Sequence, residues 1–185
     1  RLYPEVRYPA FLDDGAAAVR WVLANAAQLG GDPARVVLMG HSAGAYNAAM
    51  LALDPRWLGP QRSQVSGLIG IAGPYDFLPI KNPETQKAFN WPDTPRDSQV
   101  FGHVTPAAPR TLLLAASSDH LVDPQRNTVG LGQRLKAAGV PVAAKVLDGV
   151  SHGTVIGAMA RPLRFLAPVR AEVLAFLGLR AGDAK

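Results

Sequence analysis

One stretch, VVLMGHSAGAYNAAMLAL at residues 36–53, constrains the fold more than any other part of the sequence. A short apolar run that begins with two valines leads into Gly-His-Ser-Ala-Gly, and an alanine-rich segment follows directly. The run at 36–39 is typical of a buried strand, and the segment at 43–53 is typical of a helix that stops at Asp54-Pro55. The sequence therefore predicts a strand, a tight turn and a helix in direct succession.

Strand and helix patterns continue to alternate along the chain. Further strands are expected at 66–73, 111–117 and 142–147, the last shorter and more polar, as suits a sheet edge. Helices are expected at 13–29, 125–138 and 162–178. Asp13 or Asp14 can cap the first of these helices, and Pro162 is placed to begin the last. This order predicts an α/β fold of three layers (α/β/α), in which a mostly parallel sheet of about four strands is covered on both faces.

Length and composition exclude several classes of protein. The chain of 185 residues is expected to form a single domain over residues 1–185, and no apolar run approaches the roughly 18 residues that span a bilayer. The net charge of +5 comes from scattered basic residues, so we expect no nucleic-acid partner. The absence of cysteine excludes disulfides and thiolate chemistry. The sequence does not identify the compartment, and a cytoplasmic location is the favoured expectation.

Residues 79–109 interrupt the alternation of strands and helices. This segment holds six of the 16 prolines, together with Phe89, Trp91 and Phe101. An irregular insertion beside an α/β sheet is typical of a lid or binding loop, so these three aromatic residues are candidates to line a substrate pocket. The alternative is that the insertion only covers the core.

Ser42 is the candidate nucleophile, because its Gly-x-Ser-x-Gly motif lies directly between a predicted strand and a predicted helix. Glycine is expected to be required at residues 40 and 44, because the strand and helix backbones approach each other there and leave no room for a side chain. Ala43 would offer its backbone N–H at the helix N-terminus to a developing oxyanion. An ordinary structural glycine turn is the alternative interpretation.

A serine nucleophile needs a base, and His152 is the candidate because it follows the last predicted strand in LDGVSHGT. His41, which lies inside the turn, is expected to point its side chain away from the nucleophile, and we also count it among the candidate substrate-binding residues. Three carboxylates compete for the role of the acid. Asp119 is favoured because it follows a buried strand, whereas Asp123 fits better as a helix cap and Asp76 follows the preceding strand.

These residues together predict acyl transfer. His152 would remove the Ser42 proton, Ser42 would attack an ester or amide carbonyl, and water would hydrolyse the acyl-enzyme. Asp119 would orient His152. This chemistry requires no metal ion and no organic cofactor.

With these residues placed, the chain resembles the α/β-hydrolases of the esterase and lipase group, near the relatives of hormone-sensitive lipase, the feruloyl esterases and kynurenine formamidase. The segments that carry the resemblance are RLYPEVRYPAFLDDGAAAVRWV, GGDPARVVLMGHSAGA, GPYDF, LLLAASSDHLVDP and GVSHGT. It implies a Ser42, Asp119 and His152 triad and a small carboxylic ester as substrate. An arylformamidase or amidase of the same fold and a non-catalytic hydrolase-like binding module are the alternatives.

The resemblance also implies that four strands and an oxyanion loop precede Arg1 in the family. On this basis the chain would hold the last four strands of an eight-stranded sheet and lack the N-terminal donors of the oxyanion hole. The strand at 36–39 would then have an open, apolar edge. We expect this edge to be covered by a preceding segment or, in a homodimer, by a second copy of the chain.

Overall fold

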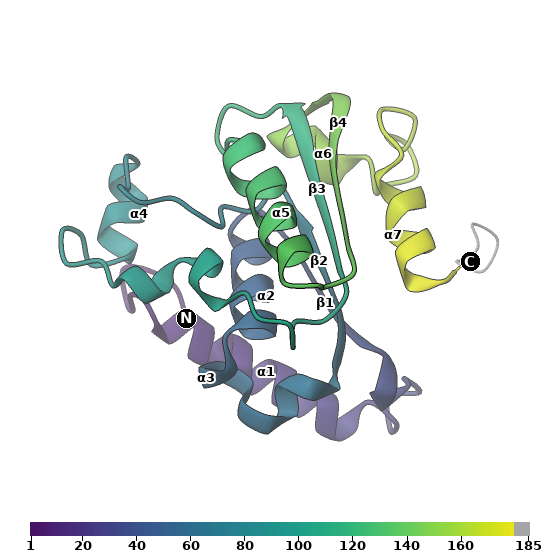
Figure 1. Cartoon of the computed structure of the whole chain (residues 1–185), viewed down its shortest axis with the longest axis horizontal. Coiled ribbons are helices and arrows are strands. Elements are labelled where there is room, and N and C mark those ends of the chain that lie inside the picture. The colour runs from purple at the N-terminus through teal and green to yellow at the C-terminus, as the bar shows by residue number, and fades with distance from the viewer. Residues whose placement is uncertain (180–185) are drawn as a thin grey trace.

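The strands form one parallel sheet. In the computed structural model, which describes residues 1–179, the four strands lie in the order β1-β2-β3-β4 and each neighbouring pair is parallel (Figure 1). Their bounds are β1 Val36–His41, β2 Val65–Ile71, β3 Thr111–Ser118 and β4 Val142–Ser151. Because parallel strands end at the same side of a sheet, Ser42, Asp119 and His152 all lie at that side, each directly after a strand.

Helices cover both faces of the sheet. They are α1 Ala10–Asn25, α2 Ala43–Leu53, α3 Pro55–Leu58, α4 Pro83–Ala88, α5 Gly130–Ala137, α6 His152–Gly157 and α7 Val169–Leu177. Short 3₁₀ turns span Pro33–Arg35, Gly59–Gln64, Arg96–Ser98 and Val100–His103, and a π turn spans Gln125–Val129. Buried side chains of α1, α2 and α5 form one core with the sheet, and those of α6 and α7 form a second core on its other face. The three-layer α/β/α fold is therefore confirmed.

Side chains of the central strands alternate between these two cores. Leu68 and Leu113 belong to the core on the α2 side, whereas Ile69, Leu112 and Leu114 belong to the core on the α7 side. All five are almost fully buried, which explains why β2 and β3 are continuous apolar runs in the sequence.

The edge strands are less buried than the central ones. Most of β1 is only partly buried, and Met39 is 42% exposed, because β2 is the only strand beside it within residues 1–179. The other edge strand, β4, is much longer than the expected 142–147. Its pairing with β3 shifts register between Ala116 and Ser118 and then continues, with Ser118 opposite Ser151.

The expected helices at 13–29, 125–138 and 162–178 all differ in their bounds from the structure. Helix α1 ends at Asn25, a π turn over Gln125–Val129 precedes α5, and both α1 and α7 begin directly after a proline. Helix α1 begins at Ala10, directly after Pro9, so neither Asp13 nor Asp14 caps it, and Asp14 instead pairs with Arg1 at 2.8 Å. The last helix begins at Val169, not at Pro162. A helix that started at Pro162 would contain Pro168 in its interior, where proline removes a hydrogen bond and clashes with the preceding turn.

A buried carboxylate joins α2 to α3. The side chain of Asp54 is 1% exposed, accepts the backbone N–H of Arg56 at 3.0 Å and pairs with the Arg56 guanidinium at 2.6 Å. Arg56 also pairs with Asp97. Burial acts to raise the pKa of Asp54, but the hydrogen bonds from Arg56 outweigh it, so the pKa lies below its ordinary value.

We expect Asp54→Asn to lower the free energy of unfolding by about 2 kcal/mol at pH 7, because asparagine keeps the helix cap but loses the charged hydrogen bonds. The matched Asp97→Asn variant removes a half-exposed carboxylate and is expected to cost less than about 1 kcal/mol. Urea unfolding measures both. A depressed pKa stabilises the fold above the unfolded-state value of about 3.9, so the difference between wild type and Asp54→Asn should shrink as the pH falls below that value. A pH-independent difference would contradict this.

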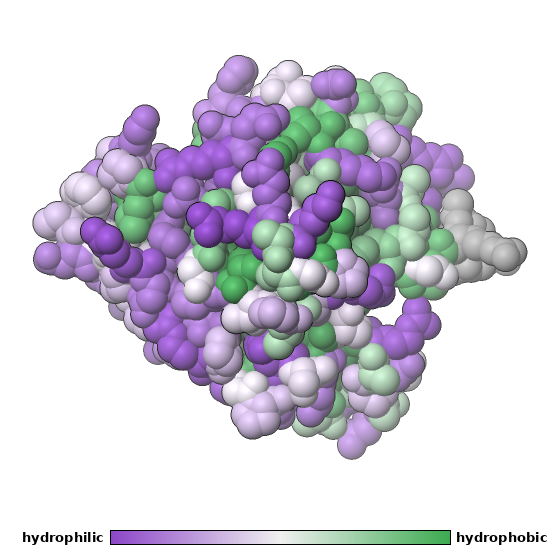
Figure 2. All heavy atoms as spheres, in the orientation of Figure 1, coloured by the Kyte–Doolittle hydropathy of each residue, from purple (hydrophilic) through white to green (hydrophobic). Residues whose placement is uncertain are grey.

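Hydrophobic residues reach the surface in separate groups, with hydrophilic residues between them, on the face shown in Figure 2. Such scattered exposure is ordinary for globular proteins. Among the helices of residues 1–179, none combines the length and the apolar character needed to cross a bilayer.

Candidate active site

Ser42 lies on the sharp turn between β1 and α2. Its backbone has φ 54° and ψ −122°, a conformation that residues with side chains rarely adopt. The Ser42 N–H donates to the Ile71 carbonyl of β2 at 2.9 Å, and the Ser42 carbonyl accepts the N–H of Ala45 at 2.9 Å and of Tyr46 at 3.1 Å. Strain of this kind costs about 1–3 kcal/mol and persists where the surroundings hold it, often at functional sites.

The two motif glycines have different surroundings. A Cβ added to Gly40 would lie 2.1 Å from the Gly44 carbonyl oxygen, so the strand and helix can approach this closely only because residue 40 has no side chain. A Cβ added to Gly44 would meet nothing within 4 Å. The expectation that both glycines relieve crowding is therefore correct for Gly40 and wrong for Gly44, which lies on the exposed side of the first turn of α2.

The His152 imidazole reaches Ser42 from the end of β4. Its Nε2 lies 2.8 Å from Ser42 Oγ, although the two residues are 110 positions apart in the chain. His152 is the first residue of α6, and not part of a loop as the sequence suggested, because β4 extends to Ser151. Ser151 and Thr154 form a capping box at the start of α6, in which the Ser151 N–H donates to Thr154 Oγ1 at 2.7 Å. This cap fixes the backbone on which His152 stands.

Asp119 holds the other side of the His152 ring. Its Oδ2 lies 2.7 Å from His152 Nδ1, and its Oδ1 accepts the backbone N–H groups of Leu121 and Val122, each at 2.9 Å. The Asp119 side chain is fully buried, and the His152 side chain is 13% exposed. The carboxylate is thus fixed by its own loop and directs one oxygen at the imidazole.

The two competing carboxylates are engaged elsewhere. Asp123 Oδ1 accepts the N–H groups of Gln125 and Arg126, as expected for a residue that caps the following helix. Asp76 pairs with the Arg126 guanidinium at 2.9 Å. Of the three candidates, Asp119 is the one that contacts His152.

His41 contacts the backbone and the ring of His152. Its Nε2 lies 2.8 Å from the backbone carbonyl oxygen of His152, and the two imidazole rings have centroids 4.8 Å apart. The side chain therefore lies against the residue that contacts Ser42. Burial lowers the pKa of His41 below its ordinary value and outweighs the hydrogen bond to the His152 carbonyl, which acts to raise it.

The start of α2 supplies backbone donors next to Ser42. Ala43 is the first residue of α2, and the N–H groups of the first helical turn have no partner within the helix. Both Ala43 and Gly44 are exposed, so the first turn of α2 borders solvent next to Ser42. Within residues 1–179, no group of three or more histidine and carboxylate side chains is arranged to hold a metal ion.

The three aromatic candidates of the 79–109 insertion occupy different places. Phe89 is buried in the core, where its ring stacks on Tyr8 at 5.4 Å and meets Tyr46 and Phe77 edge-on. The interpretation that the insertion covers the core is therefore correct for Phe89.

Phe101 and Trp91 lie farther out than Phe89. Phe101 is partly buried beneath the Arg134 guanidinium, which lies 4.7 Å from its ring centroid. Trp91 is 43% exposed and has the largest accessible surface of the three.

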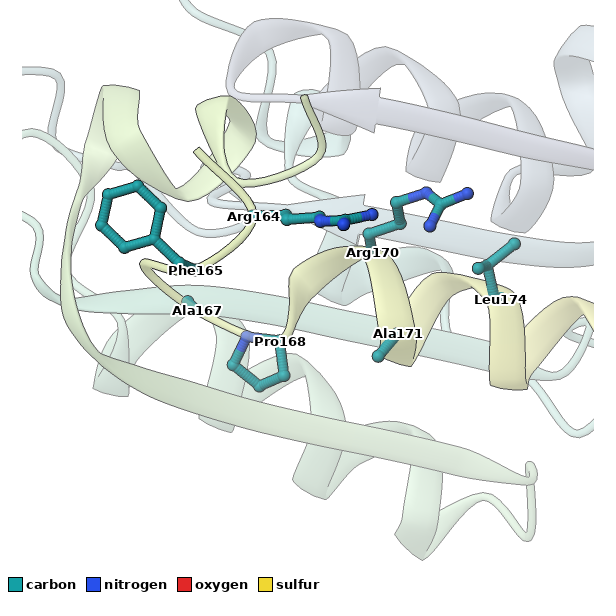
Figure 3. Close-up of a pocket in the computed structure, with 7 residues that line it drawn as sticks. All are labelled: Arg164, Phe165, Ala167, Pro168, Arg170, Ala171 and Leu174. Atoms are coloured by element: carbon teal, nitrogen blue, oxygen red, sulfur yellow. The ribbon is translucent and has the colours of Figure 1, made fainter. Parts of the chain in front are cut away.

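A surface cavity of about 360 Å³ lies beside the start of α7 (Figure 3). It is lined by Arg164, Phe165, Ala167, Pro168, Arg170, Ala171 and Leu174. None of Ser42, Asp119 and His152 lines this cavity, and none of the three aromatic candidates of the insertion does. The cavity is therefore separate from the candidate active site.

Sequence reasoning missed the contacts that support the site. Asn127, in the π turn, accepts the N–H groups of Tyr75 and Asp76 through Oδ1 and donates from Nδ2 to the Asp123 carbonyl. It thereby ties the loop after β2 to the segment that follows Asp119. The Ser-x-x-Thr spacing around His152 was a visible signal for the cap, whereas no local pattern indicated the role of Asn127.

Comparison with known proteins identifies a matching family model and similar esterases. A family model described as alpha/beta hydrolase fold matches residues 1–101. Carboxylesterase NlhH of Mycobacterium tuberculosis is 52% identical over 59 residues, which are 32% of this chain and 18% of that protein. Esterase LipI of the same organism is 30% identical over 179 residues and covers 84% of this chain and 53% of its own length. The chain thus spans about half the length, or less, of these curated relatives.

Solved structures show the same architecture. The apo form of Thermogutta terrifontis esterase 2 matches with a TM-score of 0.72 and 23% identity, over 97% of this chain and 69% of that one. At 23% identity this comparison shows a shared fold and no more.

Proposed function

The chain belongs to the alpha/beta hydrolase fold family, and on this premise we propose that it hydrolyses small carboxylic esters through an acyl-enzyme on Ser42. The observation that carries the proposal is the continuous line of contacts from Ser42 Oγ to His152 Nε2 at 2.8 Å and from His152 Nδ1 to Asp119 Oδ2 at 2.7 Å. A nucleophile, a base and a group that orients the base are the parts that acyl transfer requires. The esterases among the relatives support an ester as substrate.

In the proposed reaction, His152 Nε2 accepts the Ser42 Oγ proton while Oγ attacks the ester carbonyl carbon. The carbonyl oxygen becomes an oxyanion, which the Ala43 N–H stabilises from the N-terminus of α2. The intermediate collapses as His152 gives its proton to the leaving oxygen, and the alcohol departs. Water then attacks the acyl-enzyme, His152 accepts its proton and returns it to Ser42 Oγ, and the carboxylic acid is released.

Asp119 sets the tautomer of His152 in this scheme. Its carboxylate accepts a hydrogen bond, so it favours the proton on Nδ1 and leaves a lone pair on Nε2 to accept from Ser42. It also stabilises the imidazolium form that exists in the transition state. The two backbone N–H groups on its other oxygen keep the carboxylate in this orientation.

Labelling with a fluorophosphonate probe, followed by intact mass measurement, tests the nucleophile. We expect wild type to gain one phosphonyl group and Ser42→Ala to gain none. Ser118→Ala, which removes an exposed serine at the end of β3, should be labelled like wild type. Absence of labelling in folded wild type would contradict the proposal and favour a non-catalytic binding module.

Substrate class is tested separately, by the hydrolysis of p-nitrophenyl acetate and butyrate beside that of N-formylkynurenine. We expect the esters to be hydrolysed with the higher kcat/KM. A preference for N-formylkynurenine would contradict the esterase assignment and identify an arylformamidase that uses the same nucleophile.

A further inference from the structure

His41 lies on the face of the sheet that α6 covers. Side chains of a strand alternate between faces, and Val37 packs in the core with α6 and α7 whereas Leu38 packs in the core with α2. His41 follows Val37 by four positions and therefore faces the same side. There its Nε2 lies 2.8 Å from the carbonyl oxygen of His152, the first residue of α6.

The hydrogen bond to the His152 carbonyl requires a proton on His41 Nε2. A carbonyl oxygen only accepts, so His41 Nε2 carries a proton and donates it. This bond links the end of β1, one residue before the nucleophile, to the backbone of the base. Two hydrogen bonds thus connect this part of β1 to His152: one joins the Ser42 and His152 side chains, and the other joins the His41 side chain to the His152 carbonyl.

We propose that His41 is a positioning residue, whose Nε2–H holds the His152 carbonyl and so keeps the imidazole of His152 aimed at Ser42 Oγ. The proposal rests on the proposed function and deepens it. A base in acyl transfer must lie within hydrogen-bond reach of the proton it accepts, and small displacements of the backbone that bears it reduce the rate. The capping box of Ser151 and Thr154 holds the first turn of α6 from within, and the bond from His41 adds an anchor from β1.

The charge of His41 bears on the same step. The titratable groups that face it are His152 on α6 and Asp119 on the loop after β3. His152 becomes an imidazolium in the transition state, and a neutral His41 does not oppose this charge. Burial lowers the pKa of His41 and outweighs the hydrogen bond to the His152 carbonyl, which raises it; of the smaller effects, the His152 ring lowers the pKa and Asp119 raises it. The net pKa lies below the ordinary value, so the neutral form persists below the pH at which a free histidine becomes protonated.

Two variants separate the donor from the ring. His41→Gln keeps an N–H donor at about the position of Nε2, and His41→Phe keeps a ring without a donor. We expect His41→Phe to lower kcat for p-nitrophenyl butyrate about tenfold with KM within about twofold of wild type. We expect His41→Gln to retain kcat within about threefold. Thermal unfolding followed by circular dichroism establishes that both variants are folded.

The pH profile gives a second readout. At acid pH, below the ordinary histidine pKa of about 6.5, the kcat/KM of wild type should fall more steeply than that of His41→Gln, because a protonated His41 places a positive charge beside the imidazolium that forms in the transition state. A purely structural side chain would not change this slope. The proposal would be overturned by an equal kcat in all three proteins or by an equal loss of kcat in His41→Gln and His41→Phe. It would also be overturned if the kcat/KM of wild type and of His41→Gln fell identically at acid pH.

Nitrogen-15 NMR of the imidazole rings distinguishes failure of this inference from failure of the proposed function. If wild type neither hydrolyses esters nor reacts with the phosphonate probe, the proposed function is wrong, and the positioning role is judged from the spectra alone. We expect His152 to show the Nδ1–H tautomer in wild type and His41→Gln, and a mixture of tautomers in His41→Phe. Identical His152 spectra in all three proteins would overturn the positioning role.

Discussion

Replacement of Asp119 by asparagine is expected to lower kcat for ester hydrolysis about 10⁴-fold, with little change in KM, as happens when the triad carboxylate of a serine protease is replaced. The asparagine can still accept the N–H groups of Leu121 and Val122 through its oxygen, so the loop should keep its shape. Its amide nitrogen would then face His152 Nδ1, which lies 2.7 Å from Oδ2 in wild type. A donor at this position favours the proton on Nε2, and His152 can then no longer accept the Ser42 proton.

The other two carboxylates provide matched controls for this substitution. Asp123→Asn keeps an acceptor for the N–H groups of Gln125 and Arg126, and Asp76→Asn removes a partly exposed ion pair with Arg126. We expect both to retain kcat within about threefold of wild type, because neither carboxylate contacts His152. A large loss in either control, with Asp119→Asn near wild type, would contradict the assignment of the acid.

The sequence predicted the local unit around Ser42 well, because its determinants are local. An apolar run, a Gly-x-Ser-x-Gly turn and an alanine-rich segment form a strand, a turn and a helix wherever the strand can be buried. The order of strands and helices then placed Asp119 and His152 at the same side of the sheet. The choice among Asp119, Asp123 and Asp76 stayed open because it depends on the path of each loop after its strand.

Element boundaries were harder to predict than the elements themselves. Pro9 and Pro168 directly precede helices here, whereas the sequence prediction began one helix at an acidic cap and the other at Pro162. The length of β4 depends on its pairing with β3 across a register shift, which no pattern within residues 142–151 records.

Contacts over long separations in the chain were not predictable from one sequence. His41 and the carbonyl of His152 are 111 positions apart, and the expectation for His41 rested only on the geometry of the turn. Asn127 and the N–H of Tyr75 are 52 positions apart. Both contacts join segments that only the folded chain brings together, so the fold, rather than any motif, carries this information.

The two motif glycines provide the second large prediction, which concerns stability. We expect Gly40→Ala to lower the free energy of unfolding by at least about 3 kcal/mol, because its Cβ would lie 2.1 Å from the Gly44 carbonyl oxygen and 2.6 Å from the Ala45 nitrogen. These are backbone atoms, so no change of rotamer relieves the overlap, and β1 and α2 must move apart. That movement would also displace Ser42 from His152 and abolish labelling by the phosphonate probe.

Gly44→Ala adds the same methyl group four residues later and is the matched control. Its Cβ meets nothing within 4 Å, and residue 44 lies in the first turn of α2, where alanine is a better helix former than glycine. We therefore expect Gly44→Ala to raise the free energy of unfolding by about 0.5 kcal/mol and to leave labelling of Ser42 intact.

Urea unfolding of Gly40→Ala and Gly44→Ala measures both changes in the free energy of unfolding. If the two were equally stable, the close approach of β1 and α2 at Gly40 could not be what the motif requires. A loss confined to Gly40→Ala would mean that the first glycine of the motif serves the packing of the turn, and that the second is free to vary within this chain.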